Sequence, residues 1–70
     1  MDELEGLKDL IIRIEGMLRS QRDTYAILRE KCQQKGRIGD VKYFTGKIEV
    51  LDMTMHLLDV LYSVVEWERR

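Results

Sequence analysis

The chain has 70 residues, a formal net charge of −1 at neutral pH and 36% charged residues. A chain this short folds as one domain and buries little apolar surface, so small scaffolds usually gain stability from disulfides, a structural metal or a second subunit. The single cysteine, Cys32, excludes an internal disulfide, and Cys32 with the lone His56 is too little for a zinc site. Proline is absent, which favours helices, so the composition predicts a helical protein that oligomerises.

The first predicted element is a helix over about residues 2–34. Its apolar positions alternate at spacings of three and four: Leu4, Leu7, Ile11, Ile14, Leu18, Tyr25, Leu28 and Cys32, with Gln21 as the one polar member. This spacing is the a/d seam of a heptad pattern, typical of helices that pack along their length. Leu10 and Met17 widen the seam at the neighbouring g position. Ile12 and Ile27 fall outside it, and we expect both to be exposed.

A turn is predicted at about residues 35–40. Gly36 can end the first helix in the left-handed conformation, and Gly39-Asp40 supplies a second break and an N-cap. The second helix is predicted from about residue 40 to 68 by a further seam: Val41, Phe44, Ile48, Leu51, Met55, Leu58, Tyr62 and Val65. Two helices of similar length joined by a short turn fold back on each other. The predicted fold class is all-α, a two-helix antiparallel hairpin in a single domain.

The second helix carries another apolar series, which we term the outer stripe: Tyr43, Gly46, Val50, Met53, Leu57, Val60, Val64 and Trp67. At 100° per residue its centre lies about 160° from the seam, so one neighbouring helix cannot cover both. A contiguous exposed apolar face usually marks an interface. We therefore expect every member except Gly46 to contact a twin chain in a homodimeric, coiled-coil-like four-helix bundle.

The sequence contains no constellation of an enzyme, a cofactor site or a metal site. His56 lies on the polar flank of the second helix and is best explained as a solvated surface residue. Cys32 continues the first seam, where a buried thiol is a better explanation than a nucleophile. Phosphate-binding loops, zinc-ligand spacing and nucleophile elbows are absent from the sequence. We expect a non-enzymatic protein.

Acidic residues recur every seven positions on one flank of the second helix, at Asp52, Asp59 and Glu66. Paired carboxylates can bind metals, but these are about 10 Å apart along the helix and lack the Glu-x-x-His pattern of di-iron bundles. We expect a solvated face on which these carboxylates pair with Lys8, Arg22 and Arg29 of the first helix.

The turn region is basic, with Lys31, Lys35, Arg37 and Lys42 gathered at one end of the hairpin. These side chains could contact nucleic-acid phosphates. Alternatively, they could meet the acidic ends of a twin in an antiparallel dimer. The acidic ends carry Asp2, Glu3, Glu5, Glu66 and Glu68. We expect charge complementarity between subunits and keep phosphate binding as the alternative.

Three classes of function fit these features. The first is a small interaction protein that dimerises and binds another protein as a regulator, inhibitor or assembly factor, of the kind that bacteria and their viruses encode. The second is a nucleic-acid-binding hairpin dimer that uses the basic turn, and the third is a structural subunit of a larger helical assembly. We expect a cytoplasmic location without membrane contact, because a signal peptide and a long apolar run are absent and a lone cysteine suits a reducing compartment.

Overall fold

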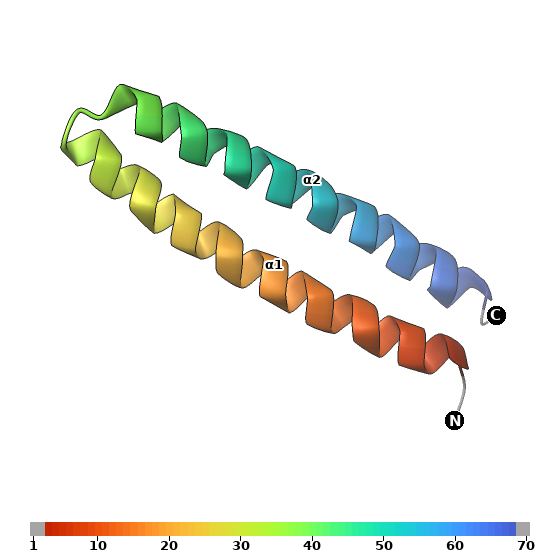
Figure 1. The fold of residues 1–70 in the computed structure, drawn as a ribbon. Coiled ribbons are helices and arrows are strands. Elements are labelled where there is room, and N and C mark those ends of the chain that lie inside the picture. The colour runs from red at the N-terminus through yellow and green to blue at the C-terminus, as the bar shows by residue number, and fades with distance from the viewer. Residues whose placement is uncertain (1–2, 69–70) are drawn as a thin grey trace.

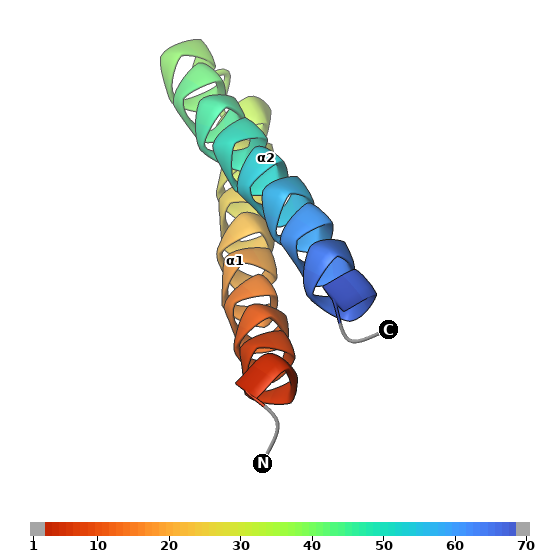
Figure 2. The ribbon, with the colours of Figure 1, turned by 90° about the vertical axis from the view of Figure 1, so that its right-hand side faces the viewer.

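The structure, a computed structural model, describes residues 3–68 as two α-helices that lie side by side and run in opposite directions (Figure 1). α1 spans Glu3–Gln34 and α2 spans Ile38–Glu68. The start of α1 and the end of α2 lie at the end of the hairpin opposite the turn, and a view turned by 90° shows the helices crossing at a shallow angle (Figure 2). The all-α hairpin predicted from the two seams is confirmed. The expected helix start at Asp2 lies outside the described residues.

The end of α1 is fixed by Gly36, which has a φ of 70°. This is the left-handed conformation that favours glycine, as expected from the sequence. The Arg37 N–H donates to the carbonyl of Cys32 at 2.9 Å, and the Gly36 N–H donates to the carbonyl of Gln33 at 3.1 Å. This pair of bonds is a Schellman motif, and it satisfies two of the carbonyls left open at the helix end.

The start of α2 differs from the prediction. The helix begins at Ile38, before Gly39, and the assignment of Asp40 as the N-cap is wrong. The Val41 N–H donates to the carbonyl of Arg37 at 3.0 Å, so Arg37 holds the cap position and Asp40 lies within the first turn. Arg37 Nε donates a hydrogen bond to the Asp40 carboxylate at 2.7 Å, and the two side chains form an ion pair. A carboxylate in the first turn also suits the positive end of the helix dipole, so Asp40 still stabilises this end.

The core is a narrow line between the two helices. Its buried apolar side chains among the described residues are Ile11, Ile48, Met55 and Val65. The other seam residues of α2 and the seam residues Ile14 and Leu18 of α1 are half-buried. Ile12 and Ile27 are more than half exposed, as predicted.

α1 does not face α2 as the sequence suggested. Leu10 and Met17, expected to widen the seam, are 51% and 67% exposed, whereas Lys8 on the opposite edge of the seam is only 9% exposed. The contact face of α1 is therefore rotated toward Lys8. At this edge the Lys8 ammonium pairs with Glu66 of α2 and lies near the Tyr62 ring. The expectation that Lys8 lies on a solvated face is wrong for the same reason.

The hairpin is long and thin, with extents of 51 × 17 × 11 Å and a radius of gyration of 16.0 Å, where a compact chain of this length has about 11 Å. Its accessible surface is 5555 Å², against roughly 4,600 Å² for a compact monomer of its mass. No helix among residues 3–68 is both long enough and apolar enough to cross a membrane. Fifteen large apolar side chains of residues 3–68 are exposed in the hairpin.

Candidate functional site

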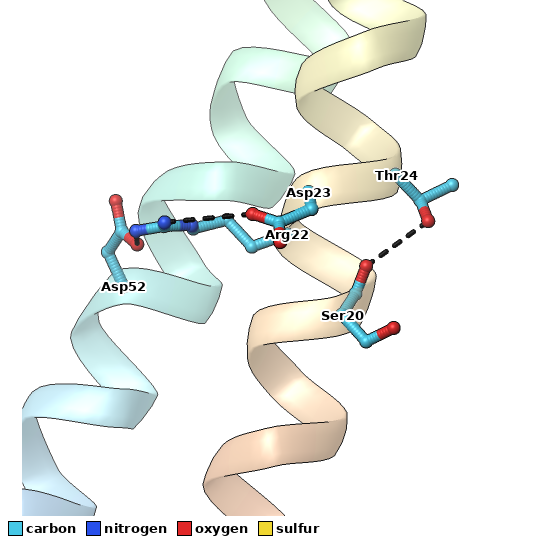
Figure 3. Close-up of polar contacts among 5 residues, drawn as sticks. All are labelled: Ser20, Arg22, Asp23, Thr24 and Asp52. Carbon is cyan, nitrogen blue, oxygen red and sulfur yellow. Dashed lines mark hydrogen bonds and ion pairs between the residues drawn. The ribbon is translucent and has the colours of Figure 1, made fainter.

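One flank of the hairpin is held by ion pairs, and we term it the charged flank. Lys8 Nζ pairs with the carboxylate of Glu66. Arg22 pairs with Asp52 at 3.1 Å across the two helices, as Figure 3 shows. The sequence predicted that the carboxylates at the seven-residue spacing pair with basic residues of α1, and Glu66 and Asp52 do so, whereas Asp59 faces Glu15. The Lys8 ammonium also lies 5.2 Å from the centre of the Tyr62 ring, a cation–π geometry. The third predicted partner, Arg29, is half-buried and makes no ion pair within residues 3–68.

The charged flank contains one pair of like charges. Glu15 faces Asp59, one heptad on from Lys8 and one heptad before Arg22. A side-chain hydrogen bond with Asp59 raises the pKa of Glu15, and desolvation adds to the rise while Arg19 opposes it. The two carboxyl groups share a position that a basic residue would fill on the pattern of the neighbouring pairs. Their contact works against the folded state at neutral pH.

The opposite flank exposes three large apolar side chains at its middle and free end, and we term it the apolar flank. On α1, Leu10 and Met17 each follow a residue of the charged flank by two positions. Two positions correspond to a rotation of 200°, so both side chains point to the other flank. On α2, Leu61 follows Asp59 by the same two positions. All three are exposed. Thr24 follows the same rule: it points away from Arg22 and donates its hydroxyl to the carbonyl of Ser20 at 3.1 Å (Figure 3). The hydroxyl therefore has a partner within α1 and does not depend on water.

The large side chains of the outer stripe are uncovered from one end of α2 to the other. Its seven predicted interface residues are all exposed, from 49% for Val60 to 74% for Trp67: Tyr43, Val50, Met53, Leu57, Val60, Val64 and Trp67. The outer stripe is on the side of α2 that faces away from α1, because the seam residues of α2 are the ones that contact α1. A solvent-facing apolar row of this length is typical of an interface.

Three of the four basic residues of the turn region gather around one cavity of about 520 Å³, which we term the turn pocket. Its lining combines apolar and charged groups: Leu28, Lys31, Cys32, Lys35, Arg37, Asp40, Tyr43 and Phe44. The Tyr43 and Phe44 rings meet edge to face with centroids 5.3 Å apart. Lys42 instead lines a smaller cavity with Gly36, Ile38 and Val41. The turn pocket therefore combines apolar and aromatic side chains with three basic residues and one acidic residue.

Sequence reasoning grouped the basic residues of the turn but missed the turn pocket, because it placed Tyr43 and Cys32 on separate stripes of separate helices. Pairing the ends of the two predicted helices across the turn would have brought these residues together. His56 is exposed, and Cys32 is half-buried in the turn pocket. Within residues 3–68, no three His, Cys, Asp or Glu side chains are placed to hold a metal ion.

Fold and surfaces define the class of the molecule: a helical hairpin with one charged flank, one apolar flank and an uncovered stripe. Comparison with protein-family models, with characterised proteins and with solved structures finds no match to this chain.

Proposed function

We propose that the chain is a non-enzymatic interaction protein that forms a homodimeric four-helix bundle. In this arrangement the two α2 helices pack antiparallel through their outer stripes, and each α1 lies on the outside. The observation that carries the proposal is the exposure of the outer stripe, where Val50, Met53 and Leu57 are each more than 60% exposed. A twin chain offers a surface of the same length and chemistry.

The energies favour association. Fully burying one large apolar side chain stabilises by about 1.5 to 3 kcal/mol. Half-burial of six such residues in each of two subunits then contributes roughly 9 to 18 kcal/mol. Loss of free translation and rotation costs on the order of 4 to 15 kcal/mol. The balance supports a dimer at micromolar concentration.

The dimer leaves the apolar flank open, and we propose that this flank binds a second protein. Leu10, Met17 and Leu61 are not members of the outer stripe, so a twin packed on that stripe does not account for them. Binding through such a surface fits a regulator, an inhibitor or an assembly factor. We place this activity in the cytoplasm, because the lone Cys32 thiol suits a reducing compartment.

Nucleic-acid binding is the second candidate. It is favoured by the convergence of Lys31, Lys35 and Arg37 beside two aromatic rings, since cations and stacked rings together suit single-stranded nucleic acid. Retention on a phosphate matrix that falls steeply with added salt would support this candidate.

Sedimentation equilibrium of the purified chain tests the dimer. The expected result is a mass of two chains at micromolar concentration, and a monomer after combined Leu57→Glu and Val60→Glu substitution. Ile12→Glu is the matched control, because Ile12 is equally exposed but lies off the stripe. A well-folded monomer of the unmodified chain would refute the proposal, and aggregation would instead favour a subunit that requires a different protein.

A further inference from the structure

We propose that the apolar flank binds one amphipathic α-helix of another protein, and that this helix carries carboxylates at the end lying over the turn and basic residues at the other end. The inference rests on the binding of a second protein proposed above and names the chemistry of that partner. Two properties of the flank support it: an uncharged middle that extends over both helices, and opposite charges at its two ends.

The middle of the apolar flank is uncharged on both helices. Thr24 lies one heptad beyond Met17 on α1, and Thr54 lies one heptad before Leu61 on α2, so both threonines fall on this flank. Each hydroxyl donates to the carbonyl four residues earlier in its own helix, at 3.1 Å for Thr24 and 2.8 Å for Thr54. An apolar partner that covers the threonines therefore leaves no hydroxyl donor unpaired.

The rotation of α1 enlarges this surface. Leu7 and Leu28 belong to the predicted seam, yet each is 37% exposed. They lie on the edge of the seam away from Lys8, and the turn of the contact face toward Lys8 leaves that edge uncovered. Leu7 adds apolar surface beside Leu10, and Leu28 lines the turn pocket, so apolar side chains of α1 follow the flank from one end to the other.

The turn end of the apolar flank is basic. Lys31 holds the flank position of α1, three heptads beyond Leu10, and lines the turn pocket together with Lys35. Neither lysine makes an ion pair within residues 3–68, whereas Arg37 of the same pocket is engaged by Asp40. Two ammonium groups are therefore available to carboxylates of a partner.

The free end of the flank, opposite the turn, is acidic. Glu3 and Glu68 hold flank positions there, one heptad before Leu10 and one heptad beyond Leu61, and both are exposed. The charges along the flank thus change from carboxylates at the free end, through an uncharged middle, to ammonium groups at the turn. A partner helix with the reverse order of charges complements the flank at both ends.

A helix is the form of partner that this surface accepts. Each α-helix of the hairpin bonds its own backbone groups, so the flank presents no strand edge to which an extended peptide could add. Two helices lying side by side instead accept a third helix against both, through apolar residues spaced three and four apart. Leu10 to Lys31 is three heptads, about 32 Å along α1, and a partner helix of similar length contacts both the uncharged middle and the basic end.

The proposed dimer would carry this surface twice. The spacings of the outer stripe read the same from either end, so two antiparallel copies match when the two-fold axis lies level with Met55. An axis that exchanges two packed antiparallel helices is perpendicular to the plane containing them, so the apolar flanks of both copies face the same way. The dimer should therefore bind two helices on one face, one to each hairpin.

Fluorescence anisotropy with a labelled synthetic peptide at nanomolar concentration tests the inference. The peptide has three helical heptads with leucine at the a and d positions, glutamates at one end and lysines at the other. A control peptide of the same composition has its leucines moved off the common face. We expect one peptide to bind per chain, and the control peptide to bind more weakly by roughly tenfold or more.

Substitutions locate the binding surface. Met17→Glu should weaken binding by roughly tenfold or more. Ile12→Glu is the matched control and should change binding little, because Ile12 is also exposed but lies about 140° around α1 from Met17. Combined Leu57→Glu and Val60→Glu substitution should split the dimer and leave peptide binding to each chain intact.

A charge exchange tests the orientation of the partner. Lys35→Glu should weaken binding of the peptide several-fold, and a peptide with lysines in place of its glutamates should bind this variant more tightly than it binds the unmodified chain. Lys42→Glu is the matched control, because Lys42 lies outside the turn pocket, and it should change neither affinity.

Sedimentation in parallel separates the inference from the homodimer. A dimer that binds both peptides equally, or whose peptide binding does not respond to Met17→Glu, would overturn the inference and leave the homodimer standing. A peptide that splits the dimer would show that it occupies the outer stripe, which also overturns the inference. Binding to vesicles of anionic phospholipid that Met17→Glu abolishes, with no binding of either peptide, would assign the flank to a membrane surface and overturn the inference.

Discussion

Replacement of Glu15 by glutamine should stabilise the protein at neutral pH. Glu15 faces Asp59 in a row whose neighbouring contacts are ion pairs, and the Asp59 carboxyl raises the pKa of Glu15. Contacts between solvated charges are worth about 0.2 to 1 kcal/mol, so removal of the repulsion should raise the folding equilibrium constant by a factor of about 1.4 to 5. Glutamine and glutamate have similar helix propensities, so the backbone contributes little to the difference.

The pH dependence of this effect has a definite sign. Because the pKa of Glu15 is raised in the folded state, the folded protein binds more protons than the unfolded chain between the usual glutamate pKa and the raised one. Stability contributed by this site therefore increases as pH falls through that window. The advantage of Glu15→Gln should be largest at pH 7 and should shrink towards about pH 4.

Urea unfolding followed by circular dichroism, at one protein concentration and at several pH values, measures the effect. Glu49→Gln serves as the control, since Glu49 is an exposed carboxylate elsewhere on α2, and it should change stability little at pH 7. If Glu15→Gln is no more stable than the unmodified chain at pH 7, the assignment of a destabilising carboxyl pair on the charged flank is wrong.

Three further predictions concern the hairpin. Ile11→Ala should cost about 2 to 5 kcal/mol of unfolding free energy and Ile12→Ala far less, because only Ile11 is buried, and equal losses in urea titrations would place the wrong face of α1 inward. Gly16→Ala should raise stability by up to about 1 kcal/mol, because a Cβ at this position meets nothing within 4 Å. Gly36→Ala should lower stability by about 1 kcal/mol or more, because Gly36 has a positive φ. A thermal unfolding experiment in which Gly36→Ala is the more stable of the two would contradict the turn geometry. The Glu66 carboxylate raises the pKa of Lys8, so the stability that Lys8 provides should be lost as pH rises above about 10.4, and a Lys8→Met variant should lack this alkaline loss in the same assay.

The hairpin could be predicted from sequence because its signals are local and periodic. The seams set which residues of α2 face α1, and Gly36 alone marked the helix end. The start of α2 was misplaced because Asp40 is a good N-cap residue by type, whereas its ion pair with Arg37 acts from within the first turn. Residue preference does not reveal which residue provides the first helical carbonyl.

The rotation of α1 could not be predicted from hydrophobicity. Leu10 and Met17 are better core residues than Lys8 by type, yet Lys8 is the buried one. Which of these residues is buried depends on Glu66 and Tyr62, which contact the Lys8 ammonium group and lie more than 50 residues away in sequence. The turn pocket escaped prediction for a related reason, because its walls come from both helices.

The central claim is an antiparallel dimer formed by the outer stripes, and thiol cross-linking in a Cys32→Ser background tests it most directly. With the two-fold axis level with Met55, the two copies of residue 53 lie about 6 Å apart along the helix, whereas the two copies of residue 67 lie about 36 Å apart. A short bifunctional thiol reagent should therefore cross-link the Met53→Cys chain to its twin and leave the Trp67→Cys chain unlinked, and a mixture of Tyr43→Cys and Trp67→Cys chains should cross-link with each other. Efficient cross-linking of Trp67→Cys to its own copy, with none for Met53→Cys, would show parallel subunits and contradict the account.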